Sequence, residues 1–224
     1  MNTIYQKESP AENKLSLGLR VPAHLISWIF HPLFITTYLT GFLLFLHPYA
    51  FAGIPDKGKF FVFISILINT AFIPGFAVLL MRFLKLIGSM ELPTQKDRII
   101  PLAVTMIFYF WTWYVRLSLP DTSVLFKQLL MGAFMGVCIT WMLNIFYKVS
   151  MHAVAAGGMV LYILLISYSG DIHTGLYIAL AVLLAGIITS SRLILQRHTA
   201  QEVYSGFMAG LLSQLIAWAW YHLL

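Results

Sequence analysis

A histidine, a glutamate and an arginine lie close together in one short segment near the end of the chain. The segment Ser191-Arg192-Leu-Ile-Leu-Gln-Arg197-His198-Thr-Ala-Gln-Glu202 stands between two strongly apolar stretches. Residues four apart share one face of a helix, so the Glu202 carboxylate can orient the His198 imidazole. The planar guanidinium of Arg192 suits an oxyanion, most naturally a phosphate. These residues indicate half of the active site of a phosphatase with a histidine nucleophile.

The chemistry expected of this segment depends on a neutral imidazole. Such a ring can attack phosphorus and form a phosphohistidine that water later hydrolyses. A neighbouring carboxylate must hold the ring in the correct tautomer, and Glu202 can do so. A histidine and a glutamate four apart more often form a structural pair, but Ser191 and Arg192 at this offset favour the catalytic interpretation.

A second polar segment, Lys148-Val-Ser150-Met-His152, lies where an apolar stretch begins. The free N–H groups and the dipole at a helix start favour a bound anion. His152 could protonate the departing alkoxide or phosphate, while Ser150 and Lys148 hold non-bridging oxygens. Taken alone, His152 would be interpreted as a histidine that caps a helix at the membrane interface.

A third segment, Gln95-Lys96-Asp97-Arg98, immediately precedes another apolar stretch. Cations at a membrane boundary usually anchor a helix to lipid headgroups. For Lys96, this anchoring role and phosphate binding are given equal weight. Arg98 is the stronger phosphate ligand, because Pro101 fixes the local entry of the chain into the helix.

Together, the three segments resemble the signatures of the type-2 phosphatidic acid phosphatase superfamily, K-x6-R-P, P-S-G-H and S-R-x5-H-x3-D. The resemblance covers roughly residues 91–206, and its third signature is the most specific. It implies that His198 is the nucleophile and that Glu202 stands where the family has aspartate. The other positions that match family residues are Arg98 in the first signature, Ser150 and His152 in the second, and Ser191 and Arg192 in the third.

The chain departs from the family pattern at several positions. Glu91 stands where the first signature has lysine, and Pro101 does not directly follow Arg98. Val149 and Met151 replace the proline and glycine of the second signature. A side chain at 151 can crowd a backbone amide that should approach phosphate closely. We therefore expect a divergent member of this superfamily.

The composition predicts an integral membrane protein. Of 224 residues, 60% are hydrophobic and 10% are charged, whereas soluble domains have about 25% charged residues. The predicted fold is an all-α polytopic transmembrane helix bundle of about six to seven spans. Residues 1–20 are expected to be a polar N-terminal tail without signal-peptide features, and 21–224 a single integral-membrane phosphatase-like domain. Seven candidate spans lie near 24–47, 60–84, 99–118, 126–147, 152–169, 174–194 and 203–223.

With seven spans, all three polar segments fall on the same membrane face as the N-terminus. A site assembled from three loops is therefore predicted on that face. Lys and Arg are more frequent there, but half of them belong to the proposed site, so the charges leave its sidedness open. We expect the protein in the bacterial inner (cytoplasmic) membrane.

A site at a membrane face suits a lipid phosphate substrate with its chains in the bilayer. The resemblance implies phosphatidate, phosphatidylglycerol phosphate, a polyprenyl diphosphate or a phosphorylated lipid A. An alternative is a catalytically inactive relative that binds or transports lipid phosphates. A membrane prenyltransferase is a weaker hypothesis, because the Asp-rich magnesium motifs it needs are missing among eight acidic residues. No metal, cofactor or nucleic acid partner is expected, and the oligomeric state stays open.

Overall fold

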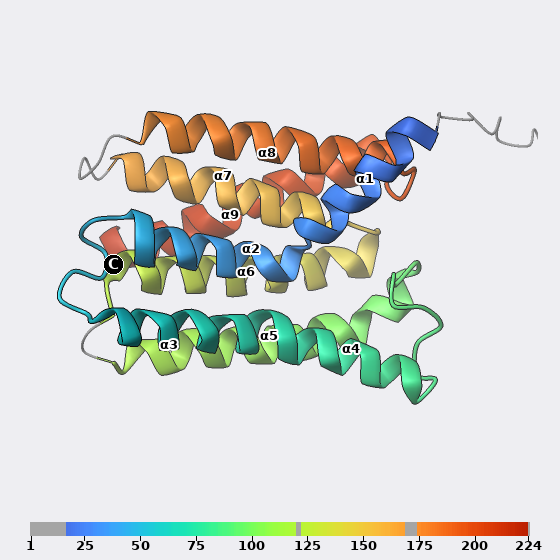
Figure 1. Cartoon of the computed structure of the whole chain (residues 1–224). Coiled ribbons are helices and arrows are strands. Elements are labelled where there is room, and N and C mark those ends of the chain that lie inside the picture. Colours follow the sequence, from blue (N-terminus) through green and yellow to red (C-terminus); the bar gives the residue numbers. More distant parts are fainter. Residues whose placement is uncertain (1–16, 120–121, 169–173, 224) are drawn as a thin grey trace, which may run out of the picture.

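The protein is a helical bundle, described here by a computed structural model over residues 17–119, 122–168 and 174–223. All regular structure in these ranges is helical, which confirms the all-α prediction (Figure 1). Residues 1–16, most of the expected N-terminal tail, lie outside the described residues, and helix α1 begins before residue 21. The helices are α1 (Leu17–Ile29), α2 (Pro32–Gly41), η1 (Phe42–Leu46), α3 (Asp56–Ile66), η2 (Leu67–Phe72), α4 (Ile73–Phe83), α5 (Gln95–Leu117), α6 (Val124–Phe146), α7 (Met151–Tyr168), α8 (Gly175–Ile194) and α9 (Ala200–Leu223).

About six helical segments of the described chain can cross a membrane. Five are long and apolar enough by themselves: Asp56–Phe83, Gln95–Leu117, Val124–Phe146, Met151–Tyr168 and Gly175–Ile194. A sixth is the pair Gly18–Ile29 and Pro32–Leu46, which is bent by 60°.

The first and last helical segments differ from the first and last of the seven predicted spans. The first expected span, 24–47, is broken, because Pro32 has no N–H group to continue α1 and instead begins α2. The last expected span, 203–223, corresponds to α9, which is not among the segments above. Polar residues within α9, Ser213 and Gln214 among them, lower its hydropathy.

Successive long helices run in alternating directions along the bundle (Figure 1). As a result, the connections 84–94, 147–150 and 195–199 all lie at the end where α1 begins. This is the end that the sequence predicts for the three polar segments. The alternation of the helices therefore brings together residues that are far apart in the chain.

Local capping fixes where two site helices begin. Thr94 and Asp97 form a capping box at the start of α5, with the Asp97 N–H donating to Thr94 Oγ1 at 3.2 Å. This box places Arg98 in the first turn of α5. At α7, the Ser150 hydroxyl oxygen accepts the N–H of Ala153 at 3.4 Å. The cap places His152 in the first turn of α7.

Helices α7 and α9 pack with their backbones in contact. A methyl group on Gly206 would lie 2.8 Å from the carbonyl oxygen of Ser150, and one on Gly210 would overlap the carbonyl oxygen of Val154. Glycine at these positions therefore allows a close crossing, which is typical of membrane helices. The crossing holds the start of α9, and Glu202 with it, against the start of α7.

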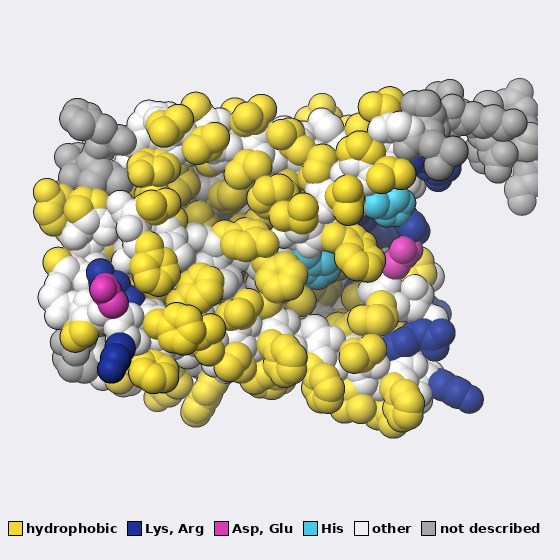
Figure 2. Space-filling model, in the orientation of Figure 1, with side chains coloured by type: hydrophobic (Ala, Val, Ile, Leu, Met, Phe, Trp, Pro, Cys, Tyr) yellow, Lys and Arg dark blue, Asp and Glu magenta, His cyan; other side chains and the backbone are white. Residues whose placement is uncertain are grey.

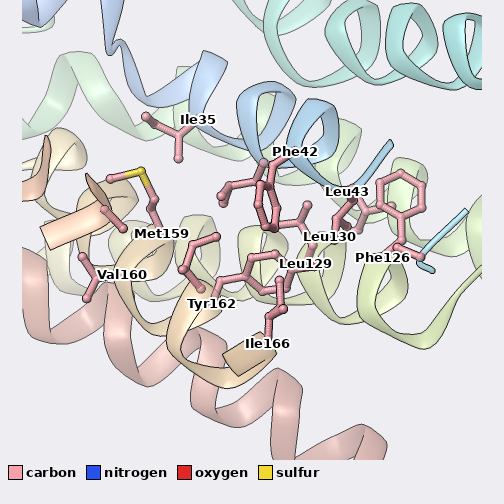
Figure 3. Packing of buried hydrophobic residues seen from close by; sticks show 14 of the residues in the cluster. Ile35, Phe42, Leu43, Phe126, Leu129, Leu130, Met159, Val160, Tyr162 and Ile166 are labelled. Carbon is pink, nitrogen blue, oxygen red and sulfur yellow. The ribbon is translucent and has the colours of Figure 1, made fainter. Parts of the chain in front are cut away.

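The apolar core fills the half of the bundle away from the three connections. Figure 3 shows side chains of α2, η1, α6 and α7 meeting there, among them Leu43, Phe126 and Ile166. Toward the middle of the bundle, Leu129 and Met159 belong to this core and also border a cavity. That cavity leads from the core to the end where the three connections lie.

Candidate active site

His198 and Glu202 form a short polar contact at the segment after α8. Helix α8 ends near Leu195, and Gln196 takes a left-handed conformation (φ 52°) that turns the chain toward α9. His198 precedes α9, and Glu202 lies in its first turn. The distance between His198 Nδ1 and Glu202 Oε2 is 2.7 Å, so the four-residue spacing brings the two side chains together as predicted.

The surroundings of His198 favour the neutral ring. Burial and the nearby cations Arg98, Lys148 and Arg192 lower the pKa of His198 to about 3. Three cations and one anion, Glu202, thus lie near the ring. In the neutral ring, Nδ1 carries the proton and donates to Glu202, which leaves the lone pair on Nε2. Nε2 has no hydrogen-bond partner among the described residues, so it is the available nucleophilic atom.

Arg192 lies in the last turn of α8 and has one donor without an acceptor. Its Nη1 donates to the hydroxyl oxygen of Ser27 at 3.0 Å. Its Nε is buried and has no partner in the described part of the chain. A buried guanidinium N–H without an acceptor costs free energy, so an oxyanion here would complete the site.

His152 is held by the backbone of α1. Its Nε2 lies 3.1 Å from the carbonyl oxygen of Ser27, which can only accept, so Nε2 carries a proton. The ring also contacts His31 edge to face, with 5.5 Å between ring centroids. His152 is 8% exposed and lines the cavity. The atom of His152 that can exchange a proton with a ligand is therefore Nδ1.

Arg98 links connection 84–94 to connection 147–150. Its Nε donates to the carbonyl oxygen of Leu92 at 2.9 Å, and its Nη1 donates to that of Val149 at 2.7 Å. Arg98 is 3% exposed and lines the cavity. Two of its three nitrogens thus fix the loops, and the positive charge remains at the cavity wall.

Lys148 also faces the cavity. Burial and the Arg98 cation lower the pKa of its ammonium group from the ordinary value. Its Nζ donates to the carbonyl oxygen of Arg197 at 3.0 Å. Lys148 is therefore a second cation near His198, supplied by the connection before α7.

Three predicted ligands do not line the cavity. Lys96 is exposed, because it lies two residues from Arg98 and so on another side of α5. Ser150 is fully buried and caps α7, while its N–H donates to the carbonyl oxygen of Glu202. Ser191 is buried between Ser27 and the backbone of α8. Ser150 and Ser191 position neighbouring residues, and Lys96 contributes no contact to the site.

One cavity of about 600 Å³ gathers the remaining predicted residues except Glu202, which reaches it only through its contact with His198. Figure 2 shows basic and histidine side chains at the end of the bundle where α1 begins, whereas hydrophobic side chains cover its flanks. The cavity runs from this polar end into the apolar interior. The basic and histidine side chains that the three segments contribute to it are Arg98, Lys148, His152, Arg192, Arg197 and His198.

Helix α1 and the residue that caps α2 supply polar groups that the sequence interpretation did not place in the site. His24, Ser27 and His31 line the cavity, and Ser27 contacts both His152 and Arg192. His24 and Ser27 are three residues apart on one face of α1, and His31 precedes α2 as its N-cap. A polar stripe at that spacing in an apolar segment is a signal that could have found them.

No protein-family model, curated protein or solved structure matches the chain. The functional interpretation therefore rests on the residues and their geometry. Among the described residues, no group of three or more His, Cys, Asp or Glu side chains lies close enough to hold a metal ion. The polar end of the cavity is dominated by cations, which suits an anionic ligand.

Proposed function

We propose that the protein is a membrane lipid phosphatase that hydrolyses a phosphate or diphosphate monoester of a lipid. The observation that carries the proposal is that His198, whose Nδ1 contacts Glu202, lines the same cavity as Arg192, whose Nε is buried without a partner among the described residues. Glu202 holds Nδ1 of the ring, so Nε2 can act as nucleophile. A nucleophile beside unfilled anion donors supports phosphoryl transfer.

In the first step, the Nε2 lone pair of His198 attacks phosphorus and the bond from phosphorus to the lipid oxygen breaks. The ring becomes positively charged, and Glu202 stabilises it. Arg192, Arg98 and Lys148 offset the charge on the non-bridging oxygens. The lipid alkoxide takes a proton from Nδ1 of His152, because Nε2 of that ring stays bound to the backbone of α1. His152 receives this proton from the monoanionic phosphate of the substrate when the substrate binds.

In the second step, water attacks the phosphohistidine and returns the site to its starting state. The proton of the water passes to Nδ1 of His152, and the bond between phosphorus and nitrogen breaks. Inorganic phosphate takes this proton from His152 as it leaves, and His198 is neutral again. His152 thus acts first as acid and then as base.

A lipid substrate is supported by the shape of the cavity. Its cationic end lies at the end of the bundle with the three connections, and its walls become apolar toward the interior. A phosphate would be bound at the headgroup level and a hydrocarbon chain below it. Phosphatidate, phosphatidylglycerol phosphate and polyprenyl diphosphates belong to this class. The resemblance to the type-2 phosphatidic acid phosphatase superfamily supports the same class of substrate.

A non-catalytic lipid-phosphate binding or transport protein is the second candidate. It is favoured by Met151, whose side chain lines the cavity where the family has glycine. It is also favoured by Ser150, whose hydroxyl is turned toward the backbone of α7. Purified protein that binds lipid phosphates tightly but releases no phosphate would support this candidate.

The decisive experiment measures phosphate release by purified protein in lipid nanodiscs from a panel of lipid phosphates. We expect turnover by the wild type that is insensitive to a metal chelator. His198→Ala and Arg192→Ala are expected to reduce it to background, while the exposed residues His222 and Arg82 serve as matched controls through His222→Ala and Arg82→Ala. Retained turnover in a folded His198→Ala protein would refute the assignment. An acid-labile phosphoryl adduct on the wild type would support the phosphohistidine.

We propose the inner membrane of a bacterium as the location of this activity. Reporters fused to each terminus would show which face carries the polar end of the cavity. A reporter at the N-terminus should lie on the same face as the site, since α1 begins at that end of the bundle.

A further inference from the structure

Gln214 lies deep in the bundle with an unused hydrogen-bond acceptor. It is 3% exposed and lines the same cavity as His198. Its side-chain oxygen Oε1 is buried and has no hydrogen-bond partner among the described residues. A buried amide oxygen without a donor is costly in an apolar interior, so its retention at a cavity wall points to a ligand.

Gln214 lies far along α9 from the polar end of the cavity. The helix begins at Ala200, so at 1.5 Å per residue Gln214 lies about 21 Å farther along its axis. The hydrocarbon core of a bilayer is about 30 Å thick. A group that reaches Gln214 from the phosphate end must therefore be carried on a long apolar chain.

The walls between the two ends fit such a chain. They include apolar side chains of three helices, such as Leu102, Ala133 and Val154. Two of the wall hydroxyls are used within their own helices, since Thr105 donates to Pro101 O at 2.8 Å and Thr140 donates to Gly136 O at 2.7 Å. These two hydroxyls therefore do not donate to Gln214.

Glycine keeps the Gln214 amide at the cavity wall. A methyl group on Gly132 of α6 would overlap the amide, and one on Gly158 of α7 would lie 3.7 Å from Gln214 Cγ. The two helices therefore leave space for the amide. A side chain at Gly132 would push the amide away from its position.

We propose that the deep end of the cavity is a binding subsite for a hydroxyl group on the hydrocarbon chain of the substrate. The hydroxyl donates to Gln214 Oε1, and its own oxygen can accept from the amide Nε2. A charged amine would need a carboxylate partner in this apolar region, so a neutral hydroxyl fits better. This inference depends on the proposed function only in that a phosphate group is assumed to bind at the polar end of the cavity. The substrate class becomes a lipid phosphate with a hydroxylated chain.

The test measures binding of dephosphorylated chains, so it does not depend on turnover. Long-chain monoalcohols and diols of matched length compete with a fluorescent lipid for wild-type protein in nanodiscs. We expect a diol whose hydroxyls lie about 21 Å apart to bind about tenfold more tightly than the monoalcohol. Gln214→Leu should abolish this preference, whereas Gln201→Leu at the exposed start of α9 should keep it.

A second variant guards against misfolding of Gln214→Leu. Gly132→Ala leaves Gln214 in place but displaces its amide, so it should also reduce the preference for the diol. Equal binding of diol and monoalcohol by the wild type, or a preference retained in both variants, would overturn the proposal and indicate that water satisfies Gln214. A preference for the diol in a protein that releases no phosphate would support the hydroxyl subsite and contradict only the proposed phosphatase activity.

Discussion

Glu91 and Arg197 form a two-point ion pair at the mouth of the cavity. The distances are 2.6 Å between Nη1 and Oε2 and 3.1 Å between Nη2 and Oε1. The pair joins connection 84–94 to connection 195–199, next to His198. Both side chains are partly exposed, so the pair contributes at most about 1 kcal/mol to stability. Its larger effect is to neutralise a cation that an anionic substrate would otherwise meet.

Glu91→Gln should therefore improve capture of lipid phosphate. The amide keeps the size of the side chain but frees the charge of Arg197. We expect the KM to fall about two- to fivefold at low ionic strength, with the gain fading in high salt. Initial rates at two salt concentrations measure this effect. A raised KM would instead mean that the ion pair positions Arg197 for binding.

Glu202→Gln should impair turnover more than substrate binding. An amide can donate to Nδ1 of His198 and so stabilise the tautomer with the proton on Nε2, which removes the nucleophilic lone pair. By analogy with other histidine–carboxylate pairs, kcat should fall about 10²- to 10⁴-fold. Glu202→Asp keeps the charge on a shorter arm and should retain more activity. Steady-state kinetics that rank the two variants in the opposite order would contradict this role.

The arrangement of the site could be predicted from the sequence where spacing alone determines it. The four-residue interval places Glu202 at His198, and the alternation of apolar stretches places both at the end that holds Arg98. Which side chains point into the cavity is harder to infer, because Lys96 and Lys148 both lie next to the start of an apolar helix. Only Lys148 lines the cavity.

Contacts between distant helices were not predictable from local pattern. Ser27 accepts from Arg192 because α1 packs against α8, and a single sequence carries no sign of that pairing. Ser150 was expected to bind phosphate, but its hydroxyl caps α7. A serine before a helix serves a cap more often than a ligand. The first span was expected to be continuous, but Pro32 begins a new helix there, and the 60° bend depends on packing.

Lys148→Met should raise the pH below which activity is lost. Burial and the cations around His198 together hold its pKa at about 3, so the ring stays neutral down to low pH. Removing one cation raises this pKa, and activity is then lost at higher pH as the ring becomes protonated. Profiles of kcat/KM against pH measure the shift, since the titration of the substrate is common to both proteins. Lys57→Met, an exposed site at the other end of the bundle, should leave the profile unchanged.

Ser27→Ala should weaken phosphate binding without unfolding the protein. The substitution removes the hydroxyl that accepts from Arg192 Nη1 but keeps the backbone carbonyl that holds His152. A less ordered Arg192 should weaken inhibition by inorganic phosphate about tenfold. Inhibition constants measure this change, with Ser190→Ala on the exposed side of α8 as control. An unchanged constant would exclude Ser27 from the positioning of Arg192.

Gly210→Ala should separate helices α7 and α9. The added methyl group would overlap the Val154 carbonyl oxygen and lie 2.7 Å from the backbone nitrogen of Gly158, and neither atom can move without its helix. Overpacking of this kind costs about 1–3 kcal/mol. Gly186→Ala on α8 is the matched control, because nothing lies within 4 Å of its added methyl group. There, the higher helix propensity of alanine should keep or raise stability.

Thermal unfolding in detergent, followed by tryptophan fluorescence, compares the two glycine variants directly. The midpoint should fall for Gly210→Ala and stay level or rise for Gly186→Ala. Loss of the close crossing would also move Glu202, because the Ser150 N–H donates to its carbonyl oxygen at 3.1 Å. Turnover of Gly210→Ala should therefore decline even below its unfolding midpoint. Equal midpoints and equal turnover for both variants would mean that the contact between α7 and α9 does not support the site.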